Sequence, residues 1–254
     1  MTASIAVSHP ESGVALVELS RGKVNALDSA MYRELADVFE ELSDRVDTTV
    51  VVLTGKGKNF CGGNDLHEFQ SMSAENGDRR MREIRRGLFS VMDCAVPVVA
   101  AVNGAALGSG LGLTAVCDVV VASDRAVFGL PEMNVGVLGG GRFAARMLPQ
   151  QAVRRLFFTA EPVGAATMRD WGAPIEVVPE SELLNVAMMR ARSIAAKNRY
   201  AVTLAKQSLN GCESLDLKRG YELEQSFTVR LADDPHAKAA VDARIEQLAR
   251  KDRS

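Results

Sequence analysis

Two short glycine-rich stretches and one carboxylate are the parts of this sequence that could do chemistry together. The stretches lie at residues 60–66 and 103–112, and each follows an apolar run of the strand type. Glycine-rich turns leave backbone N–H groups free to point at a ligand, and two such groups aimed at one oxygen form an oxyanion hole. Glu132, in the segment 128–132, adds a group that can transfer a proton. The combination predicts chemistry through an enolate or a tetrahedral oxyanion.

The elements that must position these groups alternate between strands and helices. Apolar residues recur at helical spacing after Asp28 and Ser29, either of which can cap a helix. Such alternation favours an α/β fold with mostly parallel strands. The strand patterns lie at 14–19, 49–53, 97–102, 119–122 and 175–178, and helical patterns lie at 31–42, 156–160 and 165–171.

After residue 180 the pattern becomes helical. Apolar positions at helical spacing predict amphipathic helices over 183–194, 200–209, 219–229 and 237–248. We therefore expect an α/β core over residues 1–195 and a helical portion over residues 196–254.

Bulk properties narrow the classes of partner. The 254 residues carry a formal net charge of −2, which gives no reason to expect nucleic acid or an anionic membrane as partner. Four cysteines without a C-x-x-C pair are typical of reduced thiols in a cytoplasmic protein. The three histidines are far apart in sequence, so no metal site is predicted.

Two segments bear on whether the sequence contains a secretory leader or a membrane span. Residues 1–10 lack the basic stretch and apolar core of a secretory leader. Residues 94–117 carry no charge and are long enough to span a bilayer, but Pro97, Asn103 and four glycines interrupt them. A strand, a turn and a buried helix are expected there instead.

The second glycine stretch also invites a dinucleotide-binding interpretation. A strand at 98–102 leads into glycines, and Asp124 follows the next strand. The spacing is Gly108-x-Gly110-x-Gly112 rather than G-x-G-x-x-G, and the crossover over 109–117 is short for a βαβ helix. Both observations argue against that interpretation.

Each feature taken singly has a structural explanation. Glycine turns more often serve tight packing or positive φ, and a glutamate beside Pro131 is more often a helix cap or a solvated acid. A basic run of five arginines, Arg79, Arg80, Arg82, Arg85 and Arg86, is interpreted as a solvated helix face. Contact of that run with coenzyme A phosphates or a polar acyl group is the alternative.

The joint pattern resembles the crotonase superfamily, that is, the enoyl-CoA hydratase/isomerase family, over nearly the whole length. The resemblance implies an α/β fold built as a spiral of ββα repeats, with a helical C-terminal portion that forms a homo-trimer or, as a dimer of trimers, a hexamer. The matching segments are 21–27 (RGKVNAL), 52–55 (VLTG), 60–66 (FCGGNDL), 97–110 (PVVAAVNGAALGSG), 117–118 (CD), 128–132 (FGLPE) and 173–178 (APIEVV).

The resemblance also implies roles for individual residues. The backbone N–H groups of Asn64 and Ser109 are expected to bind the thioester oxygen of an acyl-CoA, and Glu132 matches one of the two glutamates of the hydratases. No cofactor is implied, because coenzyme A is part of the substrate. The residues expected along the substrate and coenzyme A path are Lys23, Val24, Asp65, Leu66, His67, Gly108 and Gly112, with His67 where relatives often have lysine.

The most informative departure from the family pattern is Gly112, which stands where hydratases carry their second glutamate. The segment 137–142 and the tail over 237–244 depart as well. A single glutamate suffices to move a proton between two carbons, so double-bond isomerisation from Δ3 to Δ2 is the predicted reaction. Hydration of a 2-enoyl-CoA is the second interpretation, followed by decarboxylation or C–C cleavage. A member that binds acyl-CoA without catalysis stays open.

Overall fold

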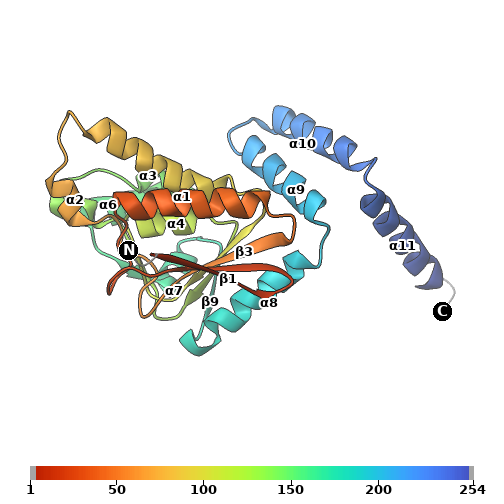
Figure 1. Ribbon diagram of the computed structural model, residues 1–254, viewed down its shortest axis with the longest axis horizontal. Helices are drawn as coiled ribbons and strands as arrows, with labels where there is room; N and C mark the ends of the chain where they lie inside the picture. The colour runs from red at the N-terminus through yellow and green to blue at the C-terminus, as the bar shows by residue number, and fades with distance from the viewer. Residues whose placement is uncertain (1–3, 252–254) are drawn as a thin grey trace.

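The computed structural model describes residues 4–251 (Figure 1). Residues 1–3 of the predicted α/β core and residues 252–254 of the predicted helical portion lie outside the described residues. The main sheet has six strands in the order β1-β2-β3-β4-β6-β9. Within this main sheet, β1 and β2 pair antiparallel and all the other neighbouring strands pair parallel. The strands are β1 (Ile5–Glu11), β2 (Gly13–Leu19), β3 (Thr48–Gly55), β4 (Val98–Val102), β6 (Val119–Ser123) and β9 (Ile175–Val178).

The parallel strands of this sheet are covered on both faces. Every residue of β3 and β4 is buried, which is typical of a central parallel strand covered on two sides. On one face, β-branched residues of β2, β3 and β4 pack against α8 (Leu183–Ala195). The other face packs against a larger cluster that contains the buried residues of α1 (Ser29–Asp44) and α4 (Ser109–Val116).

A second, three-stranded sheet was not predicted from the sequence. It has the order β5-β7-β8, with β5 (Ala105–Leu107), β7 (Val127–Gly129) and β8 (Val163–Gly164). The strands β5 and β7 are parallel, and they bring the segments before Ser109 and before Glu132 side by side. This small sheet therefore joins two of the predicted functional segments.

The helix α1 begins where the sequence predicted. Asp28 is its N-cap, and its carboxylate accepts a hydrogen bond from the N–H of Met31 at 2.8 Å. The buried positions Leu35, Phe39 and Leu42 recur at helical spacing and form the inner face. The helix packs beside α3 (Gly77–Met92), as Figure 1 shows.

Short helices fill the remaining connections of the core. The uncharged residues 94–117 form the expected strand (β4) and buried helix (α4), and the expected turn between them contains the short strand β5. None of the helices within residues 4–251 is both long enough and apolar enough to cross a membrane. The short helices are α2 (Leu66–Gln70), η1 (Pro131–Val135), α5 (Gly141–Ala144), α6 (Gln150–Thr159), α7 (Ala165–Asp170) and η2 (Glu180–Glu182).

The helices after α8 differ in how they contact the core. On α9 (Arg199–Cys212), Lys206 is only 4% exposed. Its ammonium donates to Asp118 Oδ2 at 2.8 Å and to the carbonyl oxygens of Val96 and Val91 at 3.2 and 3.4 Å. The following α10 (Leu217–Leu231) packs on α9, whereas α11 (Pro235–Lys251) extends away from both sheets (Figure 1).

Candidate active site

The first glycine-rich turn follows β3 and is held by backbone bonds to the second. The N–H of Cys61 donates to Ala105 O at 2.9 Å, and the N–H of Leu107 donates to Cys61 O at 3.0 Å. Gly63 has φ of +96°, and a Cβ there would lie 2.8 Å from the carbonyl oxygen of Leu107. Glycine is required at this position because both the conformation and the close approach exclude a side chain.

The second turn connects β5 to α4 through Gly108. This residue has φ of +54°, and a Cβ on it would lie 3.0 Å from Glu132 Oε1. The absence of a side chain at Gly108 thus lets the carboxylate approach the N-terminus of α4. Ser109 is the first residue of that helix, where backbone N–H groups have no partner within the helix.

Asn64 and Ser109 lie together beside the same cavity. Asn64 Nδ2 donates to Ser109 Oγ at 2.9 Å. Among the hydrogen bonds recorded for residues 4–251, none outside the helices has the peptide N–H of Asn64 or Ser109 as its donor. Within the described residues, both N–H groups are therefore without a recorded backbone acceptor, and their oxyanion role stays a prediction.

Among the described residues that line the cavity, Glu132 is the one acid. It lies in η1, and its Oε2 is buried without a hydrogen-bond partner. Burial raises the pKa of Glu132 from an ordinary 4.5 to about 7. A carboxyl with a pKa near neutrality can serve as base and as acid in one cycle.

The cavity itself is mainly apolar. It has a volume of about 290 Å³, close to the lower end of the range for ligand pockets of roughly 300–1,000 Å³. The two turns and Glu132 form its polar end, and α3 and the segment 131–143 form its apolar walls. The apolar lining side chains are Leu66, Phe69, Met81, Ile84, Leu88, Pro131, Val135, Val137, Leu138 and Phe143.

Gly112 does not line this cavity. A Cβ on Gly112 would meet the ring of Phe143 at 3.6 Å and Leu88 at 3.8 Å. A methyl group fits there, but a longer side chain would compete with the phenyl ring. The structure therefore places an aromatic ring beside the position where hydratases carry their second glutamate.

Only some of the other residues expected on the substrate path line the cavity. Leu66 and Gly108 line the cavity, whereas Lys23, Val24, Asp65 and His67 do not. Asp65 caps α2 by accepting from the N–H of His67 at 2.9 Å, and it pairs with Arg21 at 2.7 Å. Hydrogen bonding to Arg21 holds the pKa of Asp65 below its usual range. A coenzyme A contact at these residues stays a prediction.

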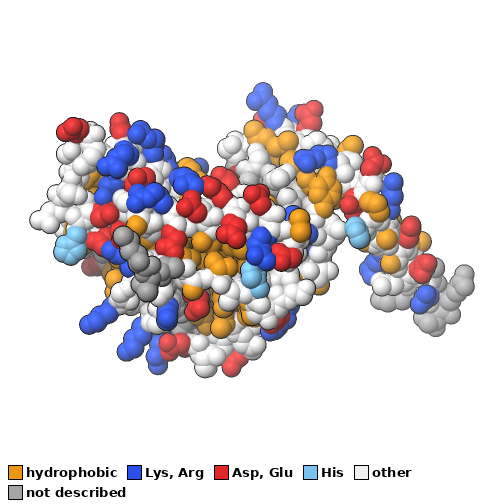
Figure 2. All heavy atoms as spheres, in the orientation of Figure 1, with side chains coloured by type: hydrophobic (Ala, Val, Ile, Leu, Met, Phe, Trp, Pro, Cys, Tyr) orange, Lys and Arg blue, Asp and Glu red, His pale blue; other side chains and the backbone are white. Residues whose placement is uncertain are grey.

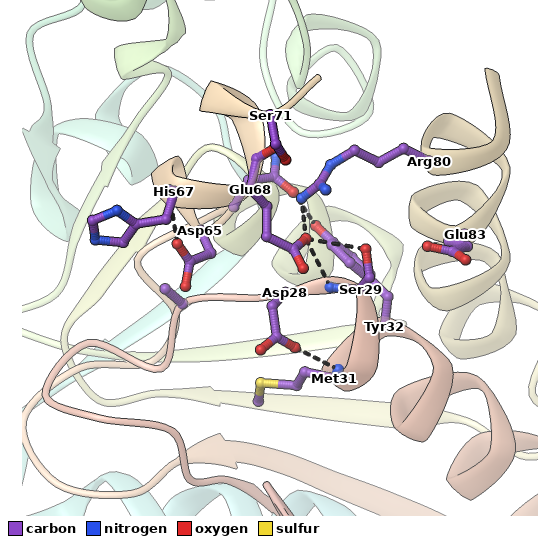
Figure 3. A network of polar contacts seen from close by, with 12 residues as sticks. Asp28, Ser29, Met31, Tyr32, Asp65, His67, Glu68, Ser71, Arg80 and Glu83 are labelled. Carbon is purple, nitrogen blue, oxygen red and sulfur yellow. Dashed lines mark hydrogen bonds and ion pairs between the residues drawn. The ribbon is translucent and has the colours of Figure 1, made fainter. Parts of the chain in front are cut away.

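A polar network positions the short helix α2 (Figure 3). Glu68 accepts from the N–H and the hydroxyl of Ser29 at 2.9 and 3.0 Å and also pairs with Arg80. The Arg80 guanidinium lies 5.4 Å from the centre of the Phe69 ring, which lines the cavity. Arg80 thus faces inward, whereas Arg79, Arg82, Arg85 and Arg86 are exposed as expected of a solvated face.

Several cavity residues were missed by sequence reasoning. Phe143 and Leu138 lie in a segment whose shape the sequence did not reveal, and Met81 and Ile84 lie on the arginine-rich helix. The apolar positions of that helix, at 81, 84 and 88, recur at helical spacing among the arginines. This spacing was the available signal for an apolar wall.

Comparisons with known proteins identify the family of this chain. The enoyl-CoA hydratase/isomerase family profile matches residues 9–251. A "(7aS)-7a-methyl-1,5-dioxo-2,3,5,6,7,7a-hexahydro-1H-indene-carboxyl-CoA hydrolase" of Rhodococcus jostii (strain RHA1) is 41% identical over 86% of this chain and 85% of its own length. A short-chain-enoyl-CoA hydratase of Clostridium acetobutylicum is 32% identical over 93% of both chains. An enoyl-CoA hydratase structure from Mycobacterium smegmatis superposes with a TM-score of 0.92 at 28% identity, over 96% of this chain and 97% of the other.

Two sheets, a set of C-terminal helices and a cavity between two glycine turns define the crotonase class of α/β proteins. The chain belongs to the enoyl-CoA hydratase/isomerase family and is an acyl-CoA enzyme of that family. The predicted family and fold class are thereby confirmed.

Proposed function

We propose that this chain hydrolyses a ring C–C bond in a cyclic acyl-CoA that carries an oxo group β to the thioester, with Glu132 as its one acid–base group. The observation that carries the proposal is a single buried carboxylate without a hydrogen-bond partner, beside two open peptide N–H groups and apolar walls. The 41% identical relative, whose name describes a hydrolase of a bicyclic dioxo carboxyl-CoA, supports hydrolysis of a cyclic acyl-CoA that carries oxo groups.

The chemistry balances with one water and one carboxylate. Ionised Glu132 takes a proton from water as the water oxygen attacks the ring ketone. The bond from the ketone carbon to the thioester α-carbon then breaks, and its electron pair forms a thioester enolate. The N–H groups of Asn64 and Ser109 bind the enolate oxygen. Glu132 returns its proton to the α-carbon, which leaves a ring-opened carboxylic acid that still carries coenzyme A.

The pKa of Glu132 suits both halves of this cycle. A carboxyl at its ordinary pKa is too weak a base to deprotonate water well, whereas a pKa of about 7 improves the base and keeps the acid form accessible. The apolar walls would also accept an alicyclic ring without leaving polar groups of the protein unpaired.

Isomerisation of a 3-enoyl-CoA to a 2-enoyl-CoA is the second candidate. The observation in its favour is the same single carboxylate, since one group can remove a proton from one carbon and return it to another. Hydration of a 2-enoyl-CoA has the support of the 32% identical hydratase. Against hydration, Phe143 and Leu88 lie where a second acid would help to hold the attacking water.

The test is product analysis on three matched substrates. These are a 2-oxocyclohexane-carboxyl-CoA, a 3-enoyl-CoA and crotonyl-CoA. We expect the first to be converted to its ring-opened carboxylic acid with kcat/KM at least about tenfold above the other two, the discrimination expected from differential transition-state binding. Isomerisation or hydration as the faster reaction would overturn the proposal. Binding of all three without turnover would point to a silent acyl-CoA-binding member.

We further propose a homo-trimer or hexamer as the assembly. Large apolar side chains are exposed on α10 and α11, and Figure 2 shows hydrophobic atoms on the outer face of this region. They include Leu217, Tyr221, Val229, Val241, Ile245 and Leu248. Large apolar side chains exposed together on two neighbouring helices favour an association site there. Light scattering at micromolar concentration should give three or six times the chain mass, and a monomer would contradict the proposal.

A further inference from the structure

A chain of hydrogen bonds joins the side chains of the two residues whose N–H groups open into the cavity. The Tyr32 hydroxyl donates to Asn64 Oδ1 at 2.7 Å, and Asn64 Nδ2 donates to Ser109 Oγ at 2.9 Å. Tyr32 comes from α1, Asn64 from the first turn and Ser109 from the start of α4. Three segments that are distant in sequence are therefore linked beside the reacting end of the cavity.

Two members of this hydrogen-bond chain are buried, and the third, Asn64, is half-buried at the cavity. Tyr32 is 1% exposed and Ser109 is 8% exposed. Burial holds the pKa of Tyr32 far above its ordinary value, so the phenol stays protonated and remains a donor throughout the physiological range. Hydrogen bonds in a buried network are strong, and a buried polar group that loses its partner is costly. The three side chains are thus tightly constrained.

Backbone bonds between the two turns do not extend to the N–H groups themselves. The recorded backbone link ends where the N–H of Leu107 donates to Cys61 O at 3.0 Å. Beyond it, the Leu27 N–H donates to Gly63 O at 2.8 Å and the Gly108 N–H donates to Gly129 O at 2.9 Å, so backbone bonds tie each turn to other segments and not to the other turn. Within the described residues, the link from Asn64 to Ser109 past these glycines is the side-chain bond.

We propose that Tyr32 and the side chains of Asn64 and Ser109 form a clamp that fixes the separation of the two peptide N–H donors. The clamp rests on the proposed function only in assigning the thioester oxygen to these donors. Tyr32 does not line the cavity and acts as a positioning residue, because its hydroxyl orients the Asn64 amide. Fixed donors stabilise an oxyanion better than mobile ones since no reorganisation is needed during the reaction.

The test measures the thioester carbonyl of a bound substrate analogue. Butyryl-CoA labelled at the carbonyl carbon is bound to the full-length protein, and its C=O stretch is followed by difference infrared spectroscopy. In the wild type, the stretch should move to lower frequency on binding. Asn64→Ala, Ser109→Ala and Tyr32→Phe all keep both peptide N–H groups, and each should shrink that shift, Tyr32→Phe least. Removing a whole oxyanion donor costs ~10²–10³ in kcat, so loosening one should cost about tenfold with little change in Kd.

Thr114→Val is the matched control. It removes a buried hydroxyl of α4 that bonds Gly110 O at 3.0 Å, and it should lower thermal stability without moving the carbonyl frequency. The double variant Asn64→Ala/Ser109→Ala should lose no more kcat than the worse single variant, because each single variant already breaks the bond between Asn64 and Ser109.

An unshifted carbonyl in the wild type would overturn the clamp, as would an unchanged shift in Asn64→Ala and Ser109→Ala or additive losses in the double variant. The infrared measurement needs binding but no turnover. It therefore stands apart from the product analysis, which alone decides the reaction.

Discussion

The two ends of the cavity are built in different ways. At the polar end, backbone bonds and two glycines with positive φ position Asn64, Ser109 and Glu132. At the apolar end, side chains from α3 and the segment 131–143 form the walls, and Leu138 is 80% exposed. Substitutions at the polar end should therefore change the rate of the chemical step. Substitutions at the apolar end should change which acyl group is accepted.

The strongest test of this contrast is Glu132→Gln. The amide keeps the size of the side chain but cannot take a proton, so kcat should fall ~10²–10⁴-fold while acyl-CoA affinity is nearly unchanged. Steady-state kinetics and a binding titration check the two parts. The exposed Glu161 offers a matched control, and Glu161→Gln should retain full activity. Retained turnover in Glu132→Gln would remove this residue from the mechanism.

A glycine of the polar end should be nearly as sensitive. Gly63→Ala places a Cβ 2.8 Å from Leu107 O at a φ of +96°, so the first turn must move and kcat should fall about 10²-fold, as for loss of an oxyanion donor. Gly57→Ala is the control, since its φ is +82° with no atom within 4 Å of the added Cβ. It should cost about 1 kcal/mol of stability yet leave kcat intact. Equal kinetic losses in both variants would mean that the effect is backbone strain alone.

Removal of an aromatic side chain from the cavity wall tests the apolar end. Phe143→Ala should shift kcat/KM about tenfold toward bulkier acyl groups, because the ring borders the cavity. It also vacates the space above Gly112, so Gly112→Glu/Phe143→Ala should hydrate crotonyl-CoA faster than Gly112→Glu alone. The measurement is the rate of 3-hydroxybutyryl-CoA formation. Wild-type hydration with kcat near ~10–10³ s⁻¹ would show that another group already holds the water.

The smallest expected effect is on stability. Because the pKa of Glu132 is raised from 4.5 to about 7 in the folded state, the folded protein binds more protons between these values and the free energy of unfolding falls as pH rises through this window. Glu132→Gln cannot ionise and therefore lacks this loss. The free energy of unfolding of the variant minus that of the wild type should be roughly 1–2 kcal/mol larger at pH 8 than at pH 4.5, allowing for partial solvent screening. Thermal melts at both pH values check it, and an equal difference at both would contradict the raised pKa. In the wild type, kcat/KM should rise with pH up to about 7.

Local patterns explain which parts could be predicted from the sequence. Continuous apolar runs such as β3 and β4, the capping residue Asp28 and the helical spacing after residue 183 depend on near neighbours, so they were predicted correctly. The strand β1 was missed because its pattern IAVSHPE contains Pro10 and mostly exposed residues. The strands of the small sheet are two or three residues long, too short to leave a periodic signal.

The candidate site likewise contains features that local sequence predicts and features that depend on long-range packing. The turns and Glu132 were recognised because their sequences are distinctive, and the structure places them around one cavity. The position of Phe143 beside Gly112 depends on long-range packing between α4 and α5, which sequence spacing does not encode. The unpartnered Oε2 of Glu132 likewise follows from everything packed around it.

The buried ammonium of Lys206 bears on where this chain could be cut. Its contacts with Asp118, Val91 and Val96 cross the boundary predicted at residue 196. A fragment that ends at that boundary would lose the cation and leave the Asp118 carboxylate and two carbonyl oxygens without this partner. The α9 helix is therefore part of the folding unit of the sheet domain, and truncation from the C-terminus should be tolerated only as far as the segment between α9 and α10.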